Sequence, residues 1–180
     1  MINFSKIQFL VGILVLLVVL AYPQRAIFAF HNEPDGFRGI PWGTNIADLP
    51  DMMLDEDGGD SKLFRRQGDG AKIGDVSLES CSYVFYRGRF YGVFIEFSSL
   101  QNARAIKETL LRQHGEGHRL RQGRFVEAYQ WSGSYVDIWY DFSESSNKGT
   151  LTYFYKPIDQ QKEANEKEEA REDASGSQKK

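Results

Sequence analysis

Cysteine and histidine are scarce in this chain of 180 residues, which has one cysteine, Cys81, and three histidines. A single thiol cannot form an internal disulfide, so packing must stabilise the fold even in an oxidising compartment. We expect Cys81 to be a small core residue on a strand rather than a nucleophile.

Standard catalytic signatures and an excess of positive charge are also missing. The sequence has no G-x-S-x-G elbow, no phosphate-binding loop and no Cys–His pair at a catalytic spacing. The formal net charge is −3, and residues 1–29 hold Lys6 and Arg25 but no acid. This balance does not suggest a nucleic-acid binder, and no motif predicts a cofactor.

Long apolar runs are rare, and the clearest one lies at the N-terminus. Residues 9–22 are apolar and follow Lys6, while Ala29 offers a small residue where cleavage could occur. Because roughly 20 apolar residues are needed to span a bilayer, we expect residues 1–29 to be a signal peptide, with an uncleaved anchor as the alternative. The protein would then be periplasmic or secreted, and it would touch a membrane only through an uncleaved N-terminal segment.

Large apolar residues are almost absent from Asp159 onward. Such a segment has nothing to bury, so residues 158–180 are predicted to be a polar tail that passes from partial helix into disorder. Residues 30–157 remain as a single domain, whose core is rich in aromatic side chains.

The pattern within this domain predicts two helices. Thr44 or Asn45 can cap the first, although Pro50 should interrupt it after one turn. Residues 98–114 have the spacing of an amphipathic helix, with serines before it and Gly115 after it. Three strands are predicted after each helix, the last three at residues 125–131, 135–142 and 150–155, with Pro157 closing the run. The order predicts an α+β fold: one antiparallel sheet of about six strands with both helices on one face, as a two-layer sandwich.

The strongest predicted hairpin turns near Arg87 and Gly88. A two-residue loop would set serines opposite apolar residues, whereas a three-residue loop over residues 86–88 pairs Tyr83 with Tyr91 and Cys81 with Val93. We favour the three-residue loop, because it collects the apolar side chains on one face.

Aromatic and basic side chains provide candidate binding residues. Strand alternation cannot bury every aromatic on one side, so we expect Trp131, Tyr135 and Trp139 to face outward, where they could stack on sugars or meet a protein. Arg119 and Arg121 could bind phosphate or glycan anions, although a strand edge guarded by charge is the commoner explanation.

Three further groups could hold a metal or catalyse hydrolysis. His114, Glu116 and His118 form a zinc ligand set, but two glycines interrupt the spacing, and a helix C-terminus explains His114 equally well. Residues 55–60 form an acidic loop that calcium could use, without the spacing of an EF-hand. The carboxylates that could support hydrolysis are Glu127, Asp137 and Asp141.

The most distinctive stretch is residues 36–44, with the sequence GFRGIPWGT. We expect it to set the fold rather than the chemistry: Pro41 and Gly43 shape a turn, and Trp42 seals the first helix against the sheet. The residues of this structural motif are Phe37, Ile40, Trp42, Gly43 and Thr44.

Together with the segment KIGD at residues 72–75 and the tyrosine-rich hairpin, this stretch resembles a group of uncharacterised exported bacterial proteins that share an F-R-G-I-x-W-G-T opening. The resemblance implies export in a Gram-negative bacterium and supplies no activity or ligand. At the level of topology alone, the predicted plan is also similar to small periplasmic assembly-factor lipoproteins, but no lipid-attachment cysteine is present.

These observations favour a non-catalytic periplasmic or secreted binding or accessory domain, whose partner is an envelope protein or a glycan. The alternative is a small cell-envelope hydrolase that uses the three carboxylates on the sheet.

Overall fold

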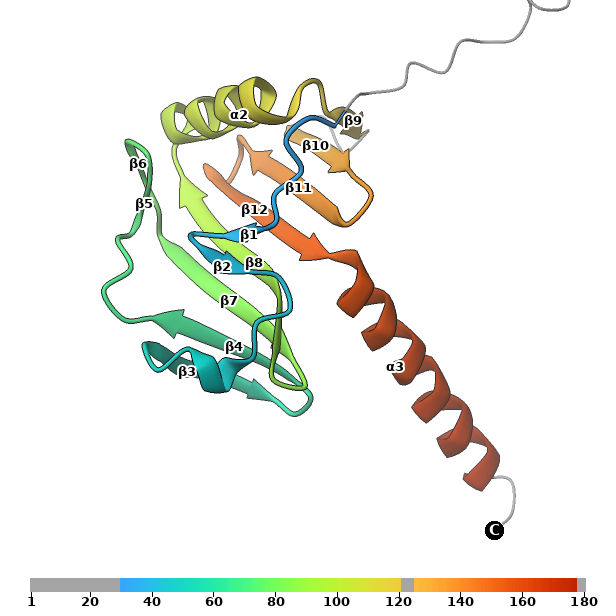
Figure 1. The fold of residues 1–180 in the computed structure, drawn as a ribbon. Helices are drawn as coiled ribbons and strands as arrows, with labels where there is room; N and C mark the ends of the chain where they lie inside the picture. Colours follow the sequence, from blue (N-terminus) through green and yellow to red (C-terminus); the bar gives the residue numbers. More distant parts are fainter. Residues whose placement is uncertain (1–29, 121–124, 178–180) are drawn as a thin grey trace, which may run out of the picture.

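The computed structural model describes residues 30–120 and 125–177, and its main element is an eight-stranded antiparallel sheet (Figure 1). The strand order is β3-β4-β7-β8-β12-β11-β10-β9. The strands are β3 (Met52–Gly58), β4 (Ser61–Arg66), β7 (Ser80–Tyr86), β8 (Arg89–Ser98), β9 (His118–Leu120), β10 (Val126–Ser132), β11 (Val136–Ser143) and β12 (Lys148–Tyr155). Two small ribbons flank it, β1 (Gly36–Phe37) with β2 (Ile40–Pro41) and β5 (Lys72–Ile73) with β6 (Val76–Ser77). The helices are η1 (Ile46–Asp48), α2 (Leu100–His114) and α3 (Lys156–Ser177).

The predicted α+β class with an antiparallel sheet is confirmed, but eight strands form the sheet instead of about six. The first predicted helix is reduced to a single 3-10 turn, and it ends before Pro50, where an interruption was expected. Asn45 caps the 3-10 turn η1, its side chain accepting from the Ala47 N–H at 2.9 Å. Pro50 lacks a backbone donor and forces Leu49 out of helical geometry, so the chain enters β3 two residues later. The order of two helices, each followed by three strands, is therefore wrong, and the topological likeness to assembly-factor lipoproteins loses its basis.

The β7–β8 hairpin turns through two residues rather than three. Arg87 and Gly88 both have positive φ, at 47° and 77°, as the commonest tight hairpin turn requires. A register shift beside Phe85 then pairs Tyr83 with Val93 and Cys81 with Ile95. Because of this shift, Phe90 takes the inner position opposite Phe85 and Tyr91 turns to the outer face. The other apolar side chains of the hairpin that were predicted to share a face do so. The favoured three-residue loop is thus wrong.

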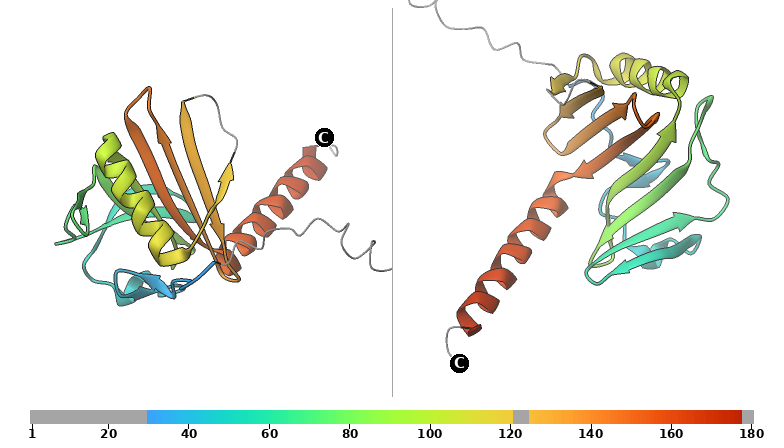
Figure 2. Two further views of the ribbon diagram at one scale, coloured as in Figure 1. Left: turned by 90° about the horizontal axis from the view of Figure 1, so that it is seen from above. Right: turned by 180° about the vertical axis from the view of Figure 1, so that it is seen from behind.

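The two faces of the sheet carry separate apolar clusters. The inner face holds the main core, and α2 covers one end of it with Ala103, Ile106 and Leu110. The outer face holds a smaller cluster, into which α3 inserts Ile158 beside Tyr91. Helices α2 and α3 therefore lie on opposite faces (Figure 2). The predicted layer of two helices on one face is not formed, because the first of that pair is only the turn η1.

Helix α2 itself agrees with the sequence pattern. The Ser99 hydroxyl accepts from the Asn102 N–H at 3.2 Å, and Gly115 follows the last turn with a φ of 80°. The predicted bounds and caps of this helix are confirmed. The last three predicted strands are also present, as β10, β11 and β12.

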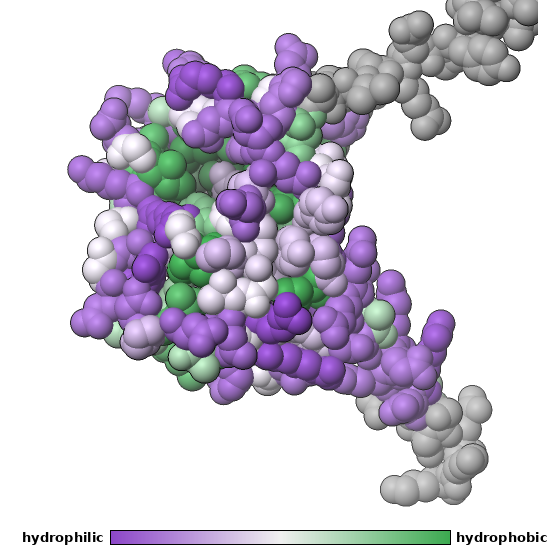
Figure 3. All heavy atoms as spheres, in the orientation of Figure 1, coloured by the Kyte–Doolittle hydropathy of each residue, from purple (hydrophilic) through white to green (hydrophobic). Residues whose placement is uncertain are grey.

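Helix α3 starts directly after β12, and Pro157 sits in its first turn, where a missing N–H does no harm. Asn165 donates to the Tyr86 hydroxyl at 2.9 Å. Farther along, the helix projects past the sheet, and its surface is almost wholly hydrophilic (Figures 1 and 3). No helix within residues 30–120 and 125–177 is long and apolar enough to cross a membrane. The predicted signal peptide or anchor, residues 1–29, lies outside the described residues.

Residues 30–49, named here the N-terminal strap, cross the inner face of the sheet. The Gly43 N–H donates to the Phe90 carbonyl at 2.7 Å, and the Phe90 N–H donates to the Thr44 carbonyl at 2.9 Å. These backbone hydrogen bonds tie the strap to β8. The Phe37 ring packs against Tyr83 and Tyr153, Trp42 packs against the same core, and Ile40 is buried in it. These contacts fit the structural role predicted for residues 36–44. The stretch packs directly on strands of the sheet, however, and does not seal a helix against it.

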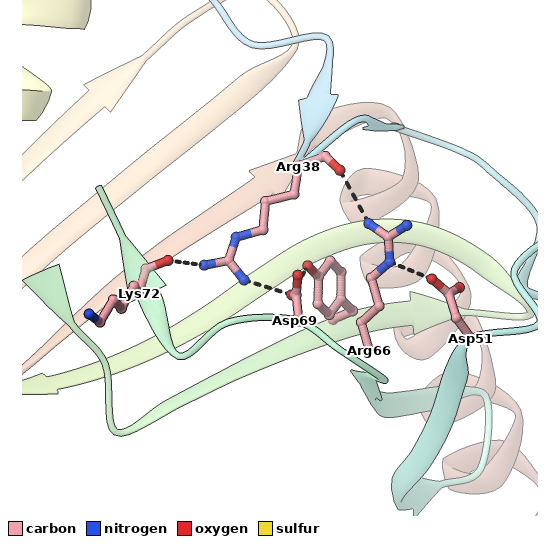
Figure 4. A network of polar contacts seen from close by, with 6 residues as sticks. Arg38, Asp51, Arg66, Asp69 and Lys72 are labelled. Atoms are coloured by element: carbon pink, nitrogen blue, oxygen red, sulfur yellow. Dashed lines mark hydrogen bonds and ion pairs between the residues drawn. The ribbon is translucent and has the colours of Figure 1, made fainter. Parts of the chain in front are cut away.

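A polar network anchors the middle of the strap (Figure 4). The Arg38 guanidinium donates to Asp69 at 2.6 Å and to the Lys72 carbonyl, and the same Asp69 oxygen accepts from the Tyr83 hydroxyl. Arg66 in turn donates to the Arg38 carbonyl at 3.3 Å and to Asp51 at 2.6 Å.

Titration in this region follows from burial. Burial raises the pKa of the Cys81 thiol to about 11, so the thiol is neutral at physiological pH. Burial also raises the pKa of Tyr83, and the hydrogen bond to Asp69 raises it further, which keeps the hydroxyl as a donor. Cys81 packs against the main core from β7, as expected of a structural cysteine.

We predict that Asp69→Ala lowers the free energy of unfolding by about 2–3 kcal/mol, because it leaves a partly buried arginine and a tyrosine hydroxyl without their acceptor. Urea denaturation of the purified protein measures the loss. Asp57→Ala is the matched control, since it breaks an exposed ion pair with Lys62 and should change stability little. Equal losses in the two variants would contradict the anchoring role of Asp69.

Candidate functional site

The clearest candidate site is a pocket where the strap meets the ends of three strands. Its volume is about 410 Å³. We name it the aromatic pocket; its lining residues are Glu33, Pro34, Asp35, Trp42, Tyr135 and Tyr155. The strap supplies the first four, the turn between β10 and β11 supplies Tyr135, and the end of β12 supplies Tyr155.

Glu33 fixes the strap to the β10–β11 turn. Its carboxylate accepts from the backbone N–H groups of Ser134, Tyr135 and Val136, at 3.0, 2.5 and 2.6 Å. A side chain at Gly133 would collide with Glu33 and Phe30, so the turn needs glycine there. No motif in the sequence marks this acid, because its role depends on a turn about 100 residues away.

Trp42 forms the back of the pocket. Its indole Nε1–H donates to the Pro34 carbonyl at 2.8 Å, and its ring stacks on Phe90 with centroids 4.9 Å apart. The Tyr155 ring lies nearly parallel to it, at 6.3 Å and 9°. The indole is half-buried, so it both packs on the sheet and faces the pocket.

The charge of the pocket is negative. Glu33 and Asp35 line it, and no lysine or arginine is among its lining residues. Asp35 is exposed, and its backbone carbonyl is occupied by the Trp42 N–H at 3.0 Å. The arrangement therefore combines aromatic rings with carboxylate acceptors at one opening.

The three aromatics predicted to face outward take different positions. Trp131 is 2% exposed, and its indole donates to the Gly115 carbonyl at 2.9 Å, so the outward position was wrong. Its partner across the strands is Ile138, on the buried face. Tyr135 and Trp139 are 61% and 40% exposed. They do not come together, because Tyr135 lies in the aromatic pocket and Trp139 on the outer face.

Trp139 belongs to an uncovered part of the outer face. It pairs across the strands with Thr152, which pairs in turn with Phe94, another exposed aromatic. Trp139 and Phe94 are thus exposed, and neither belongs to the cluster that α3 contacts.

The predicted basic residues do not form an isolated anion site. Arg119 lies on the short edge strand β9, and Arg121 lies outside the described residues. Arg119 lines a cavity of about 230 Å³ together with Arg104 and Lys107, but Glu127 and Glu144 line it as well. The two acids therefore offset most of the positive charge there.

The predicted zinc set is not assembled. His114 is buried at the end of α2, where its Nδ1–H donates to the His31 carbonyl at 3.1 Å and its ring contacts Phe30. Glu116 and His118 instead line a separate cavity of about 310 Å³. Across the residues described, no group of three histidine, cysteine or acidic side chains could hold a metal ion. The acidic stretch predicted as a calcium loop runs along β3 into its turn, and Asp57 pairs with Lys62.

The carboxylates of the hydrolase alternative are also separated. Glu127 faces α2 and pairs with Lys107 at 2.8 Å. Its neighbour across the strands is Phe142 of the inner face, whereas Asp137 and Asp141 lie on the outer face. Asp137 pairs with Lys156 at 3.0 Å, and Asp141 accepts from Thr150. Each carboxylate thus has its own partner, and the three do not share a cleft.

Comparison of the chain with models of protein families, with curated proteins and with solved structures finds no match.

We predict that Trp42→Ala lowers stability by about 2 kcal/mol, less than the 3–5 kcal/mol typical of a fully buried ring. Chemical denaturation measures the change. Trp139→Ala is the matched control, because that ring is exposed and should cost about 1 kcal/mol or less. A loss for Trp42→Ala no larger than the control would mean that the strap is not packed on the sheet.

Stability should also depend on pH through His114. Burial lowers the pKa of this imidazole below its ordinary value of 6.5, so the unfolded chain takes up the proton first. The contribution of neutral His114 to folding stability is complete at a pH above the ordinary pKa of histidine and is lost as the pH falls below it. Urea denaturation at about pH 7.5 and about pH 5.5 should show this loss, and His114→Gln should reduce it. An equal loss in the variant would assign the pH dependence to other groups.

Proposed function

We propose that the protein is an exported, non-catalytic binding module and that the aromatic pocket is its ligand site. One observation carries the proposal: Trp42, from the most distinctive stretch of the sequence, is only half-buried and opens into a cavity with two tyrosines and two acids. Concave sites with aromatic walls and a few placed polar groups are the usual form of ligand pockets.

The arrangement of charges supports binding rather than hydrolysis. A pair of carboxylates that hydrolyses a glycosidic bond must lie about 5–10 Å apart on either side of it. Here Glu127 is on one face of the sheet and Asp137 on the other, and both are neutralised by lysines. Glu33 is engaged by three backbone donors, which makes it a structural anchor rather than a proton carrier.

The proposed location follows from the N-terminal sequence. The apolar run at residues 9–22 favours export to the periplasm or secretion, and the resemblance to exported bacterial proteins agrees with it. In that compartment the ligand would be part of an envelope protein or of a glycan.

Ligand titration of the ¹⁵N-labelled full-length chain, followed by NMR, tests the proposal. The panel should contain simple amines, neutral monosaccharides and short peptides. At least one class should shift the indole signal of Trp42 and the amide signals of the β10–β11 turn. The exposed Tyr135 can be replaced without loss of the fold, so Tyr135→Ala should weaken binding in a folded protein, whereas Trp139→Ala should not.

Shifts confined to the outer face around Trp139, or no shift with any member of the panel, would contradict the proposed site.

A further inference from the structure

We propose that the aromatic pocket recognises an organic cation, in the form of an alkylammonium or quaternary ammonium group. The inference rests on the proposed binding function and adds the chemical class of the ligand. It follows from the charge, the hydrogen-bonding groups and the rings that the pocket presents.

The fixed charges of the pocket favour a cation. Both charged lining residues, Glu33 and Asp35, are acids. Lys156 follows Tyr155 in the chain but directs its ammonium group elsewhere, to the Ser132 hydroxyl, the Gly133 carbonyl and Asp137 at 2.7–3.0 Å. The negative charge of the pocket is therefore not cancelled by this neighbouring lysine, and an anionic ligand would be repelled.

The hydrogen-bonding groups point the same way. One donor, the Trp42 indole N–H, is already bound to the Pro34 carbonyl. The remaining side-chain donors of the lining are the hydroxyls of Tyr135 and Tyr155, while its carboxylates only accept. A primary alkylammonium group only donates, so it complements this set, whereas a neutral sugar needs donors as well as acceptors. A quaternary ammonium group has no N–H, so it would be held by the charge and the rings alone.

The rings supply the second attraction. A cation is stabilised over the face of tryptophan or tyrosine within about 6 Å of the ring centroid, and tryptophan is the best of these. Trp42 and Tyr155 lie nearly parallel, and Tyr135 lines the pocket from the β10–β11 turn. The stack of Trp42 on Phe90 holds the indole in place, so little ordering is needed on binding.

A titration with matched probes tests the cation. Choline and 3,3-dimethylbutan-1-ol have nearly the same shape and differ in charge. With the full-length chain and NMR detection at the Trp42 indole, choline should bind about tenfold more tightly than the neutral alcohol. Added salt should weaken choline binding and leave the alcohol unaffected.

A second pair of probes separates the two sources of such a group. Nα-acetyl-lysine methylamide represents a lysine side chain of a protein partner, and its Nε-acetylated form removes the charge. If the lysine probe binds more tightly than choline, the ligand is a protein lysine; the reverse order indicates a free quaternary ammonium compound. In either case the charged member of each pair should bind more tightly than the neutral member.

Variants of the pocket complete the test. Asp35→Asn keeps the shape of an exposed side chain and should weaken choline about fivefold, with a smaller effect on the alcohol. Trp139→Ala, on the outer face, should leave both affinities unchanged.

Equal binding of the charged and neutral probes, or tighter binding of a neutral sugar at the same signals, would refute the cationic ligand. Either result would leave the proposed binding function of the pocket standing. The absence of any shift at the pocket with every probe would overturn both.

Discussion

The ion pair between Arg38 and Asp69 is the contact on which the arrangement of the strap depends. It joins the strap to the loop after β4, and the Tyr83 hydroxyl connects strand β7 to the same carboxylate oxygen. Arg38 holds this position with a left-handed backbone, φ +48°, which is costly for a residue other than glycine. A charge-assisted bond in a partly buried setting offsets that cost, whereas the exposed ion pairs of α3 contribute little.

The same strap builds the candidate site. It is fixed near residue 31 by backbone bonding to His114, at Glu33 by the β10–β11 turn, and at Ile46 by the β7–β8 turn. Trp42 lies between these points, so its position is determined by both flanks. The walls of the aromatic pocket come from segments far apart in the chain, and a ligand that bridges them would stabilise the folded state. Fold and binding are thus linked through one segment.

Much of the fold could be predicted from local patterns, and most of the site could not. Helix α2 was predictable because Ser99, its apolar spacing and Gly115 all act within one segment. The cap at Asn45 and the interruption at Pro50 were predictable, but the pattern did not show that only a 3-10 turn would remain. The period-two alternation of β11 correctly placed Ile138 and Trp139 on opposite faces of the sheet. The same alternation does not reveal which face of β10 is buried, so Trp131 was wrongly predicted to face outward. Glu33 and Tyr155 carry no local signal for a site, because their meeting depends on how the strap crosses the sheet.

The most direct test of this account is the environment of the Trp42 indole in the full-length chain, measured by hydrogen exchange of Nε1–H and by nuclear Overhauser contacts. The account predicts slowed exchange, because Pro34 accepts this hydrogen, and contacts from the ring to Phe90 and Tyr155. Exchange at the rate of a free indole, without contacts to β8 or β12, would show that the strap is not docked and that the aromatic pocket does not exist.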